Sequence, residues 1–170
     1  MTNFDSYVLG ISDSEIEIDT VEANRALALA MVGQAALTLE IFSRELDGRL
    51  FDNTAFVEAV SDLARAHPHS RIRILVRNTD AIVKQGHRLV ELARRLSSSI
   101  EIRVIHPDYQ QRNSAFLTVD NVGWMFREHA DRYECQANFN HAGRARELVD
   151  EFNEIWEHSS PASELRRLHL

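Results

Sequence analysis

Three apolar runs of strand length, separated by stretches with helical spacing, constrain the fold of this chain more than any other feature. The runs cover residues 37–42, 71–77 and 100–105, and the middle one, RIRILVR, has period-two alternation at Ile72, Ile74 and Val76. Because strand–helix–strand units are right-handed and join parallel neighbours, the runs predict adjacent parallel strands. Their carboxyl ends would then share one edge of a sheet.

The rest of the chain adds strands to this sheet and helices to its faces. Further strands are predicted at residues 16–18, 115–119, 124–127 and 132–137, the middle two forming a hairpin. Helices are predicted at 20–34, from 53, at 80–96 with a break near Gly86, and at 141–157. Together these elements predict an α/β fold with a mixed sheet and flanking helices.

The chain is expected to form one domain. Its 170 residues fit a single domain of ordinary size, and it has no Pro/Gly-rich linker. We place the domain at residues 14–158, with a flexible lead-in at 1–13. The run Ser159-Ser160-Pro161 ends the last helix, so residues 159–170 are expected to be a C-terminal tail.

Composition excludes several classes of partner. The net charge of −7 argues against bulk binding to nucleic acid or to an anionic membrane, since both need a basic surface. No apolar run approaches the roughly 20 residues of a membrane span, and residues 1–5 lack the pattern of a secretory leader. The single cysteine, Cys135, allows no internal disulfide, which fits a reducing compartment. We therefore expect a cytoplasmic protein.

Polar side chains follow each of the three parallel runs at the predicted shared edge. Arg44 and Asp47 follow the first run, Arg77 the second and His106 the third. Ligands of open α/β sheets bind outside the carboxyl ends of the strands. The planar guanidinium fork suits a phosphate or carboxylate, so these residues form a candidate site for a small anion. The alternative interpretation is that they are solvated loop residues.

The histidines and the cysteine give weaker patterns. His87 falls on the polar side of its predicted helix and is interpreted as solvated. His129, Cys135 and His141 are evenly spaced but match no metal-binding motif. We expect no metal and no cofactor.

Residues 140–145, NHAGRA, leave an enzyme open as an alternative. The run follows a predicted strand and begins a helix, where main-chain N–H groups can cradle phosphates. It resembles the acyl-CoA pyrophosphate loop of GNAT-type acetyltransferases, which implies acyl-CoA-dependent chemistry. Asn140 stands where that loop has Gln or Arg, and the chain after the helix is too short for the remaining GNAT elements.

Residues 37–159 resemble phospholipase D-like domains, particularly a bacterial family of such domains. The resemblance rests on the strand leading to Arg44 and Asp47, the run from His87 through Leu96, and the ending FNEIW. It implies a phospholipase D-like half-fold, because active phospholipase D sites combine two copies of this unit from one duplicated chain or from two subunits.

The catalytic motif of that superfamily is degenerate here. Working members carry His-x-Lys-x-x-x-x-Asp, and the matching segment NSAFLTVD keeps only Asp120. Asn113 stands in place of the histidine that attacks phosphorus, and Ala115 in place of the lysine that binds phosphate oxygens. Lys84 is the only lysine and is not part of a His-x-Lys run. Arg127 ends the hairpin strand nearest the motif and joins the candidate anion-binding residues.

The leading interpretation is therefore a non-catalytic phospholipase D-like domain that binds an anionic ligand or a protein partner. A purely structural dimerisation domain is a further alternative. We expect a homodimer, because a single copy would expose the face that meets its twin. Large apolar side chains of the hairpin and last helix would enrich such an interface, unless the domain's own core uses them: Trp124, Met125, Phe126, Phe139 and Trp156.

Overall fold

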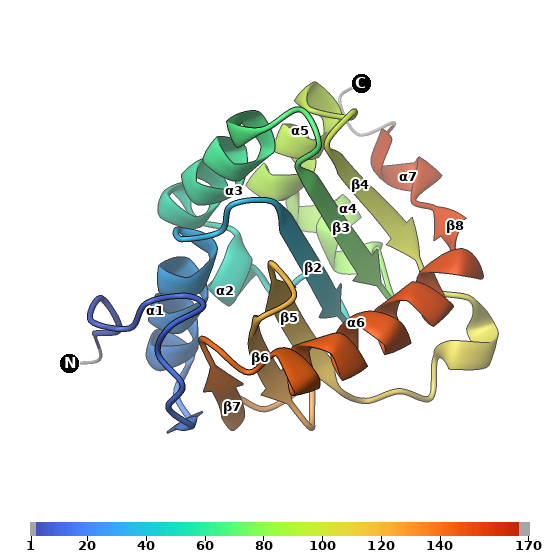
Figure 1. The fold of residues 1–170 in the computed structure, drawn as a ribbon. Helices are drawn as coiled ribbons and strands as arrows, with labels where there is room; N and C mark the ends of the chain where they lie inside the picture. Colours follow the sequence, from blue (N-terminus) through green and yellow to red (C-terminus); the bar gives the residue numbers. More distant parts are fainter. Residues whose placement is uncertain (1–2, 167–170) are drawn as a thin grey trace.

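The computed structural model describes residues 3–166 and contains one eight-stranded mixed sheet with the order β1-β7-β6-β5-β2-β3-β4-β8 (Figure 1). The strands are β1 (Ile16–Ile18), β2 (Thr38–Ser43), β3 (Arg71–Val76), β4 (Ile100–Val104), β5 (Ala115–Val119), β6 (Gly123–Arg127), β7 (Cys135–Asn138) and β8 (Ser160–Pro161). The helices are α1 (Val21–Val32), α2 (Gly48–Phe51), α3 (Thr54–Ala66), α4 (Asp80–Gln85), α5 (Arg88–Arg95), the 3₁₀ turn η1 (Pro107–Tyr109), α6 (Ala142–Glu157) and α7 (Ser163–Arg166). The predicted fold class is confirmed.

Strands β2, β3 and β4 are parallel neighbours, as their sequence pattern predicts. On the other side of β2 the sheet becomes antiparallel, with Phe42 opposite Phe116 of β5. Strand β6 turns back beside β5, which places Arg127 opposite Ala115. One edge of the sheet therefore gathers the ends of β2, β3, β4 and β6 with the start of β5.

Helices cover the two faces of the sheet unequally. Helices α1, α3 and α5 pack on one face and bury an almost entirely apolar core that includes Leu39 and Ile41 of β2. Among residues 3–166, helix α6 alone crosses the other face, where Phe42 and Leu75 meet Phe152 (Figure 1). Side chains alternate between the faces along each strand, so the same strands supply both cores.

Polar side chains on the α6 face form a buried row across the strands. Glu40 accepts a hydrogen bond from Thr118 and lies 3.3 Å from the guanidinium of Arg73. Arg73 also donates to Asn153 of α6 at 2.7 Å. Arg73 and Glu40 are 7% and 2% exposed, so α6 encloses an ion pair together with its aromatic contacts.

The helix boundaries follow local sequence rules. Thr20 and Asn53 cap α1 and α3, each accepting a main-chain N–H three residues later. Gly86 separates α4 from α5 with φ of +73°, a conformation that side chains with a Cβ rarely adopt. The expected break in this helical region is confirmed.

The segments outside the expected domain both contact the core. Phe4 is buried, and Tyr7 stacks on Phe139. At the other end β8 pairs with β4, and Leu165 is buried. The domain limits at 14–158 stay a prediction, and residues 1–2 and 167–170 of the expected lead-in and tail lie outside the described residues.

The aromatic residues proposed for a dimer interface lie mostly inside the chain's own core. Trp124, Phe139 and Trp156 are at most 7% exposed, and Met125 is also buried; only Phe126 stays half-buried. The large apolar residues thus give no support for a dimer. None of the helices within residues 3–166 is long and apolar enough to cross a membrane.

Candidate functional site

A cavity of about 620 Å³ lies at the edge of the sheet where β2 and β6 end and β5 starts. It is bounded by the loop after β2, by α4 and the start of α5, and by the loop between β6 and β7. Its lining is mainly polar and carries three arginines (Arg44, Arg49, Arg127), four carboxylates (Glu45, Asp47, Asp52, Asp131), and His87 and Tyr133. The structure therefore brings together Arg44, Asp47 and Arg127 of the candidate site predicted from the sequence.

Arg127 lies at the inner wall of the cavity and is only 6% exposed. Its Nη1 donates to the carbonyls of Ala130 (3.3 Å) and Arg132 (2.9 Å), and its guanidinium lies 5.3 Å from the ring centre of Tyr133. Burial lowers the pKa of Arg127, while the nearby carboxylate of Asp47 opposes that shift. Within residues 3–166, Arg127 makes side-chain hydrogen bonds through Nη1 alone, which leaves Nε and Nη2 available to the cavity.

Asp47 is fully engaged by the protein. One carboxylate oxygen accepts the N–H of Arg49 at 2.9 Å and caps α2, and the other accepts the hydroxyl of Tyr133 at 2.7 Å. Burial raises the pKa of Tyr133, and the bond to Asp47 raises it further. Asp47 thus balances the charge of Arg127 and fixes the tyrosine against it.

The loop between β2 and α2 is held in an unusual conformation. Leu46 has φ of +57°, a left-handed conformation that is rare for a residue with a branched side chain. Its N–H donates to Ser43 Oγ at 2.9 Å, and its carbonyl lies 3.1 Å from Nε2 of His87. Two bonds from different elements therefore hold this wall of the cavity in place.

His87 is buried, which corrects its interpretation as a solvated residue. Its Nδ1 accepts the N–H of Leu89 and caps α5, so Nε2 carries the proton that is donated to the Leu46 carbonyl. Burial lowers its pKa, although the carboxylates of Asp52 and Asp47 act in the opposite direction. His87 is thus a neutral structural link between α5 and the cavity wall.

Of the other residues predicted at this edge, Arg44 lines the cavity, while Arg77 and His106 do not. Arg44 lines it, and the enclosed Nε of Arg44 has no hydrogen-bond partner among the described residues. The main-chain N–H of Arg77 donates to the carbonyl of Arg44, yet Arg77 is not part of the lining. His106 is exposed, caps η1 and also lies outside the lining.

The degenerate motif is divided between opposite edges of the sheet. Asn113 is exposed, and its carbonyl accepts the N–H of Ala130, a residue of the cavity lining. Ala115 is buried at the start of β5 beside Arg127. Asp120 lies beyond the far end of β5 and accepts three main-chain N–H groups, from Ala36, Leu37 and Thr38. Asp120 therefore orders the turn into β2 and does not line the cavity.

Sequence reasoning missed most of the polar residues of the lining, among them His87, Asp131 and Tyr133. Helical spacing places His87 on the polar side of its predicted helix. Nothing in the local sequence indicates that it reaches a carbonyl 41 residues away. Tyr133 and Asp131 come from the irregular β6–β7 loop, where no periodicity marks a site. The single available indication was the proximity of this loop to Arg127 in the chain.

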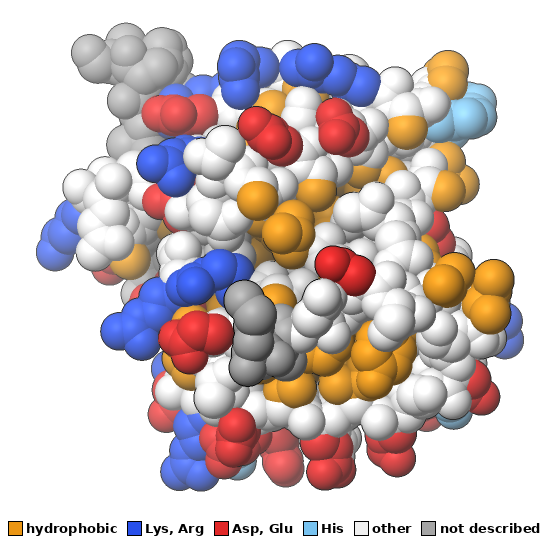
Figure 2. All heavy atoms as spheres, turned by 90° about the vertical axis from the view of Figure 1, so that its left-hand side faces the viewer, with side chains coloured by type: hydrophobic (Ala, Val, Ile, Leu, Met, Phe, Trp, Pro, Cys, Tyr) orange, Lys and Arg blue, Asp and Glu red, His pale blue; other side chains and the backbone are white. Residues whose placement is uncertain are grey.

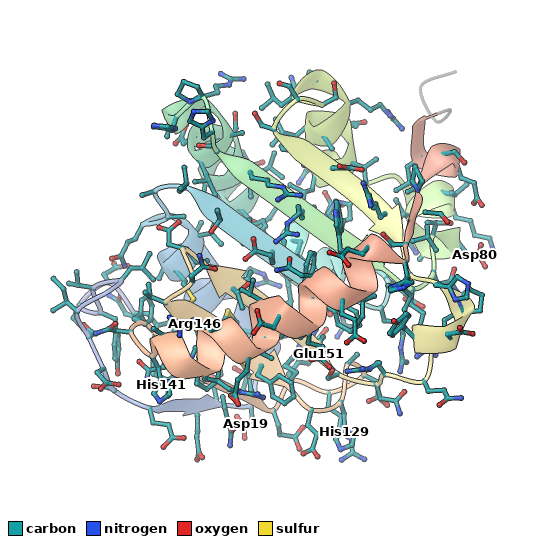
Figure 3. The ribbon with its side chains drawn as sticks, turned by 45° about the vertical axis from the view of Figure 1, so that its right-hand side comes forward. Asp19, Asp80, His129, His141, Arg146 and Glu151 are labelled. Atoms are coloured by element: carbon teal, nitrogen blue, oxygen red, sulfur yellow. The ribbon has the colours of Figure 1, made fainter. Side chains whose placement is uncertain are left out.

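The other candidate patterns do not form sites. Figure 3 shows His129 in the loop after β6 and His141 at the start of α6, well separated from one another. No potential metal-binding cluster occurs among the residues that the structure describes. Burial raises the pKa of the Cys135 thiol to about 11, which keeps the buried thiol protonated near neutral pH. His141 Nδ1 accepts the N–H of Arg144 and caps α6, so it occupies the start of the helix that the acyl-CoA alternative requires.

Several solved structures resemble this chain in fold. An archaeal chromatin protein, TrmBL2, whose structure shows a novel mode of DNA binding, matches with a TM-score of 0.63 and 15% identity over 87% of this chain and 53% of its own. Nuc, a phospholipase D family member from Salmonella typhimurium, matches with a TM-score of 0.59 and 15% identity over 87% of this chain and 97% of its own. NucT from Helicobacter pylori matches with a TM-score of 0.58 and 8% identity over 87% and 98%.

These likenesses establish a phospholipase D-like fold and no more. The chain spans about half the length of the TrmBL2 chain and nearly all of Nuc and NucT. No curated protein matches it in sequence. The model of one family matches residues 20–168, and the chain therefore belongs to the family described as a domain of unknown function (DUF7931).

Proposed function

We propose that this chain is a non-catalytic phospholipase D-like domain that binds a small anionic ligand in the cavity beside β6. The observation that carries the proposal is the pairing of Ala115 with Arg127. The position at which the superfamily resemblance implies a phosphate-binding lysine is an alanine, and a guanidinium comes from the neighbouring strand instead. Arg127 supplies a permanent positive charge at the inner wall of a solvent-accessible cavity.

Hydrogen-bonding capacity supports binding at this position. Arg127 has two nitrogens that it does not use within the described residues, and Arg44 adds an enclosed Nε without a partner. The two Arg127 nitrogens are not enclosed, so an anion can replace the water on them, whereas the unpaired Arg44 Nε is a costly buried donor that an anion reaches only after the side chain shifts. Arg44 and Arg127 line the same cavity, and two guanidinium groups in one cavity are typical of sites for phosphate or carboxylate.

The same residues argue against hydrolysis. Covalent catalysis by the superfamily's route needs a nucleophilic histidine, and Asn113 offers an amide. His87, the histidine of the cavity lining, uses both ring nitrogens on main-chain groups. The Tyr133 hydroxyl donates to Asp47 and has a raised pKa. No group in the described lining is placed as an activated nucleophile.

Thermal melting in the presence of phosphate and of simple phosphomonoesters tests binding. A ligand at a hundred times its Kd stabilises the fold by about 2.7 kcal/mol, which is readily measured as a rise in Tm. Arg127→Gln and, separately, Arg44→Ala should abolish most of this rise. Arg95→Ala on the exposed end of α5 is the matched control. Equal responses of the wild type, Arg127→Gln and Arg44→Ala would contradict the proposal.

The absence of hydrolysis has its own test. Purified protein should show no turnover of generic phosphodiesters, nucleic acid or phosphatidylcholine above background. Turnover that is retained in Arg95→Ala and lost in Arg127→Gln would show that this cavity is catalytic after all.

Nucleic acid is not the ligand we propose. The net charge is −7, and Figure 2, which views the molecule from the α1 side, shows acidic side chains gathered along the lower rim. Glu17, Asp19, Glu128 and Glu134 also surround a second hollow beside β1 and β7. A cytoplasmic location, a protein partner and a homodimer stay proposals. Light scattering that gives a mass near 19.5 kDa at every concentration would refute the dimer.

A further inference from the structure

We propose that the ligand of this cavity carries one anionic group and, elsewhere in the same molecule, hydrogen-bond donors such as hydroxyl or ammonium groups. This inference rests on the proposed function and specifies the class of ligand. It follows from the carboxylates that share the cavity with Arg127 and Arg44. A site for a bare phosphate or a polyanion would not be lined with more carboxylates than arginines.

The carboxylates of the lining differ in how far the protein already uses them. Both oxygens of Asp47 are engaged, one by Arg49 and one by Tyr133. Asp52 accepts the N–H of Arg88 through Oδ1 only. Within the described part of the chain, Asp131 accepts no hydrogen bond. Asp52 and Asp131 thus keep acceptor oxygens that a ligand can reach from the cavity.

Arg127 gives the independent reason to expect a ligand there. It lines the cavity and is more than nine-tenths buried, and its Nε and Nη2 make no hydrogen bond within the described residues. These two nitrogens are not among the enclosed unpaired atoms of the described residues, so they are open to water that a ligand can replace. The anion of the ligand would bind there, and Asp52 and Asp131 would face the rest of the molecule.

Size and rigidity agree with a molecule larger than phosphate. A volume of about 620 Å³ is within the range of roughly 300–1,000 Å³ that holds small organic ligands. The wall formed by Leu46 is held by Ser43 and His87, so the shape of the cavity is largely set before binding. A preformed site with fixed charges of both signs selects for a ligand with a matching separation of groups.

Selectivity arises because the carboxylates attract ligands that carry hydrogen-bond donors and repel ligands that carry a second negative charge. Asp52 and Asp131 accept charge-assisted hydrogen bonds from hydroxyl or ammonium groups. The same carboxylates repel a second negative charge in a partly enclosed space, where Coulomb interactions are stronger than in water. Donor-bearing monoanions should therefore bind better than simple phosphate esters, and pyrophosphate should bind least.

Isothermal titration calorimetry at fixed ionic strength provides the test. Methyl phosphate and inorganic phosphate offer the anion alone, glycerol 3-phosphate adds hydroxyls, phosphoethanolamine adds an ammonium group, and pyrophosphate adds charge. We expect at least one donor-bearing probe to bind the wild type about tenfold more tightly than methyl phosphate, a difference typical of one good charge-assisted contact. The glycerol and ethanolamine arms show which donor the cavity prefers.

A double variant, Asp52→Asn with Asp131→Asn, separates the two roles of the acids. Removing their charges should bring the affinities of methyl phosphate and the preferred donor-bearing probe to within about threefold, while pyrophosphate binds several-fold more tightly than to the wild type. Asp62→Asn, an exposed carboxylate on α3, is the matched control and should change neither.

The possible failures are distinguishable. If methyl phosphate and both donor-bearing probes bind equally well, and all depend on Arg127, the inference about ligand class is wrong and the anion site stands. If the preference exists but survives in the double variant, the acids do not create it and the inference is again wrong. If none of the probes binds in an Arg127-dependent manner, the proposed function fails and this inference fails with it.

Discussion

Arg73 and Arg127 are almost equally buried, but the protein encloses Arg73 while Arg127 lines a cavity that is open to solvent. Arg73 lies between the sheet and α6, where Glu40 and Asn153 bind its guanidinium and the rings of Phe152 and Trp156 pack over it. Arg127 binds two main-chain carbonyls and lines an open cavity. Burial alone therefore does not identify a binding residue. The informative quantity is the hydrogen-bonding capacity that remains where a ligand can reach it.

The closed arrangement around Arg73 should be the more sensitive to mutation. Burial raises the pKa of Glu40 and lowers that of Arg73, so the pair is held against a desolvation cost. Glu40→Leu should destabilise the fold by about 3–5 kcal/mol, because it leaves a buried guanidinium without its counter-charge. Chemical denaturation measures the loss. The double variant Glu40→Leu with Arg73→Met should recover most of it; equal losses in the single and double variants would show that the ion pair is irrelevant.

Asp120 offers the next largest effect, at the edge opposite the cavity. Asp120→Ala removes the acceptor of three main-chain N–H groups, which water can only partly replace. We expect a loss of about 2–3 kcal/mol in the free energy of unfolding, with anion binding unchanged. Asp120→Asn, which keeps one acceptor oxygen, should lose less. Impaired ligand binding in a folded Asp120→Ala would contradict its assignment as a structural cap.

The buried His87 predicts a dependence of stability on pH. Its folded-state pKa lies below the ordinary value of 6.5, so the unfolded chain takes up a proton first as the pH falls. The stability from neutral His87 is complete above 6.5 and is lost as the pH falls through 6.5 towards the folded pKa, with a slope of at most about 1.4 kcal/mol per pH unit. Denaturation between pH 7.5 and roughly 5 measures this slope. A His87→Gln variant with the same slope would assign it to other groups.

Arg127→Gln should be the mildest of these changes for stability, in contrast to removal of a partner of Arg73. Asp47 keeps both of its hydrogen bonds, and the cavity admits water to the vacated carbonyls. We expect a loss of about 1 kcal/mol in the absence of ligand, measured by denaturation beside Arg95→Ala. A loss as large as that of Glu40→Leu would mean that the two arginines are equivalent structural groups.

The sequence predicts the sheet better than the site, for physical reasons. Strand β3 is recognisable because its side chains alternate between two environments, and Thr20 and Asn53 mark helix starts through a contact three residues away. The meeting of Ala115 with Arg127 depends on hairpin register, and that of His87 with Leu46 on tertiary packing. Such distant contacts leave no periodic trace in a single sequence.

The same limit applies to the residues proposed for the cavity and for the dimer. Arg44 and Asp47 were found because the ends of parallel strands share an edge, a rule of topology. Arg77 and His106 obey the same rule and yet lie outside the lining, because the rule fixes an edge and not the direction of a side chain. Trp124 and Trp156 are large enough for an interface, and only the packing of α6 shows that the core uses them.

The place of β1 in the sheet has a consequence for how the chain folds during synthesis. Ile16 pairs with Ala137 of β7, and β2 pairs with β5 on one side, so β1 and one side of β2 wait for partners encoded far downstream. Pairing over such distances is slow, and unpaired apolar strand edges are prone to association. The nascent chain should therefore remain a client for chaperones until β7 has left the ribosome, whatever ligand the finished domain binds.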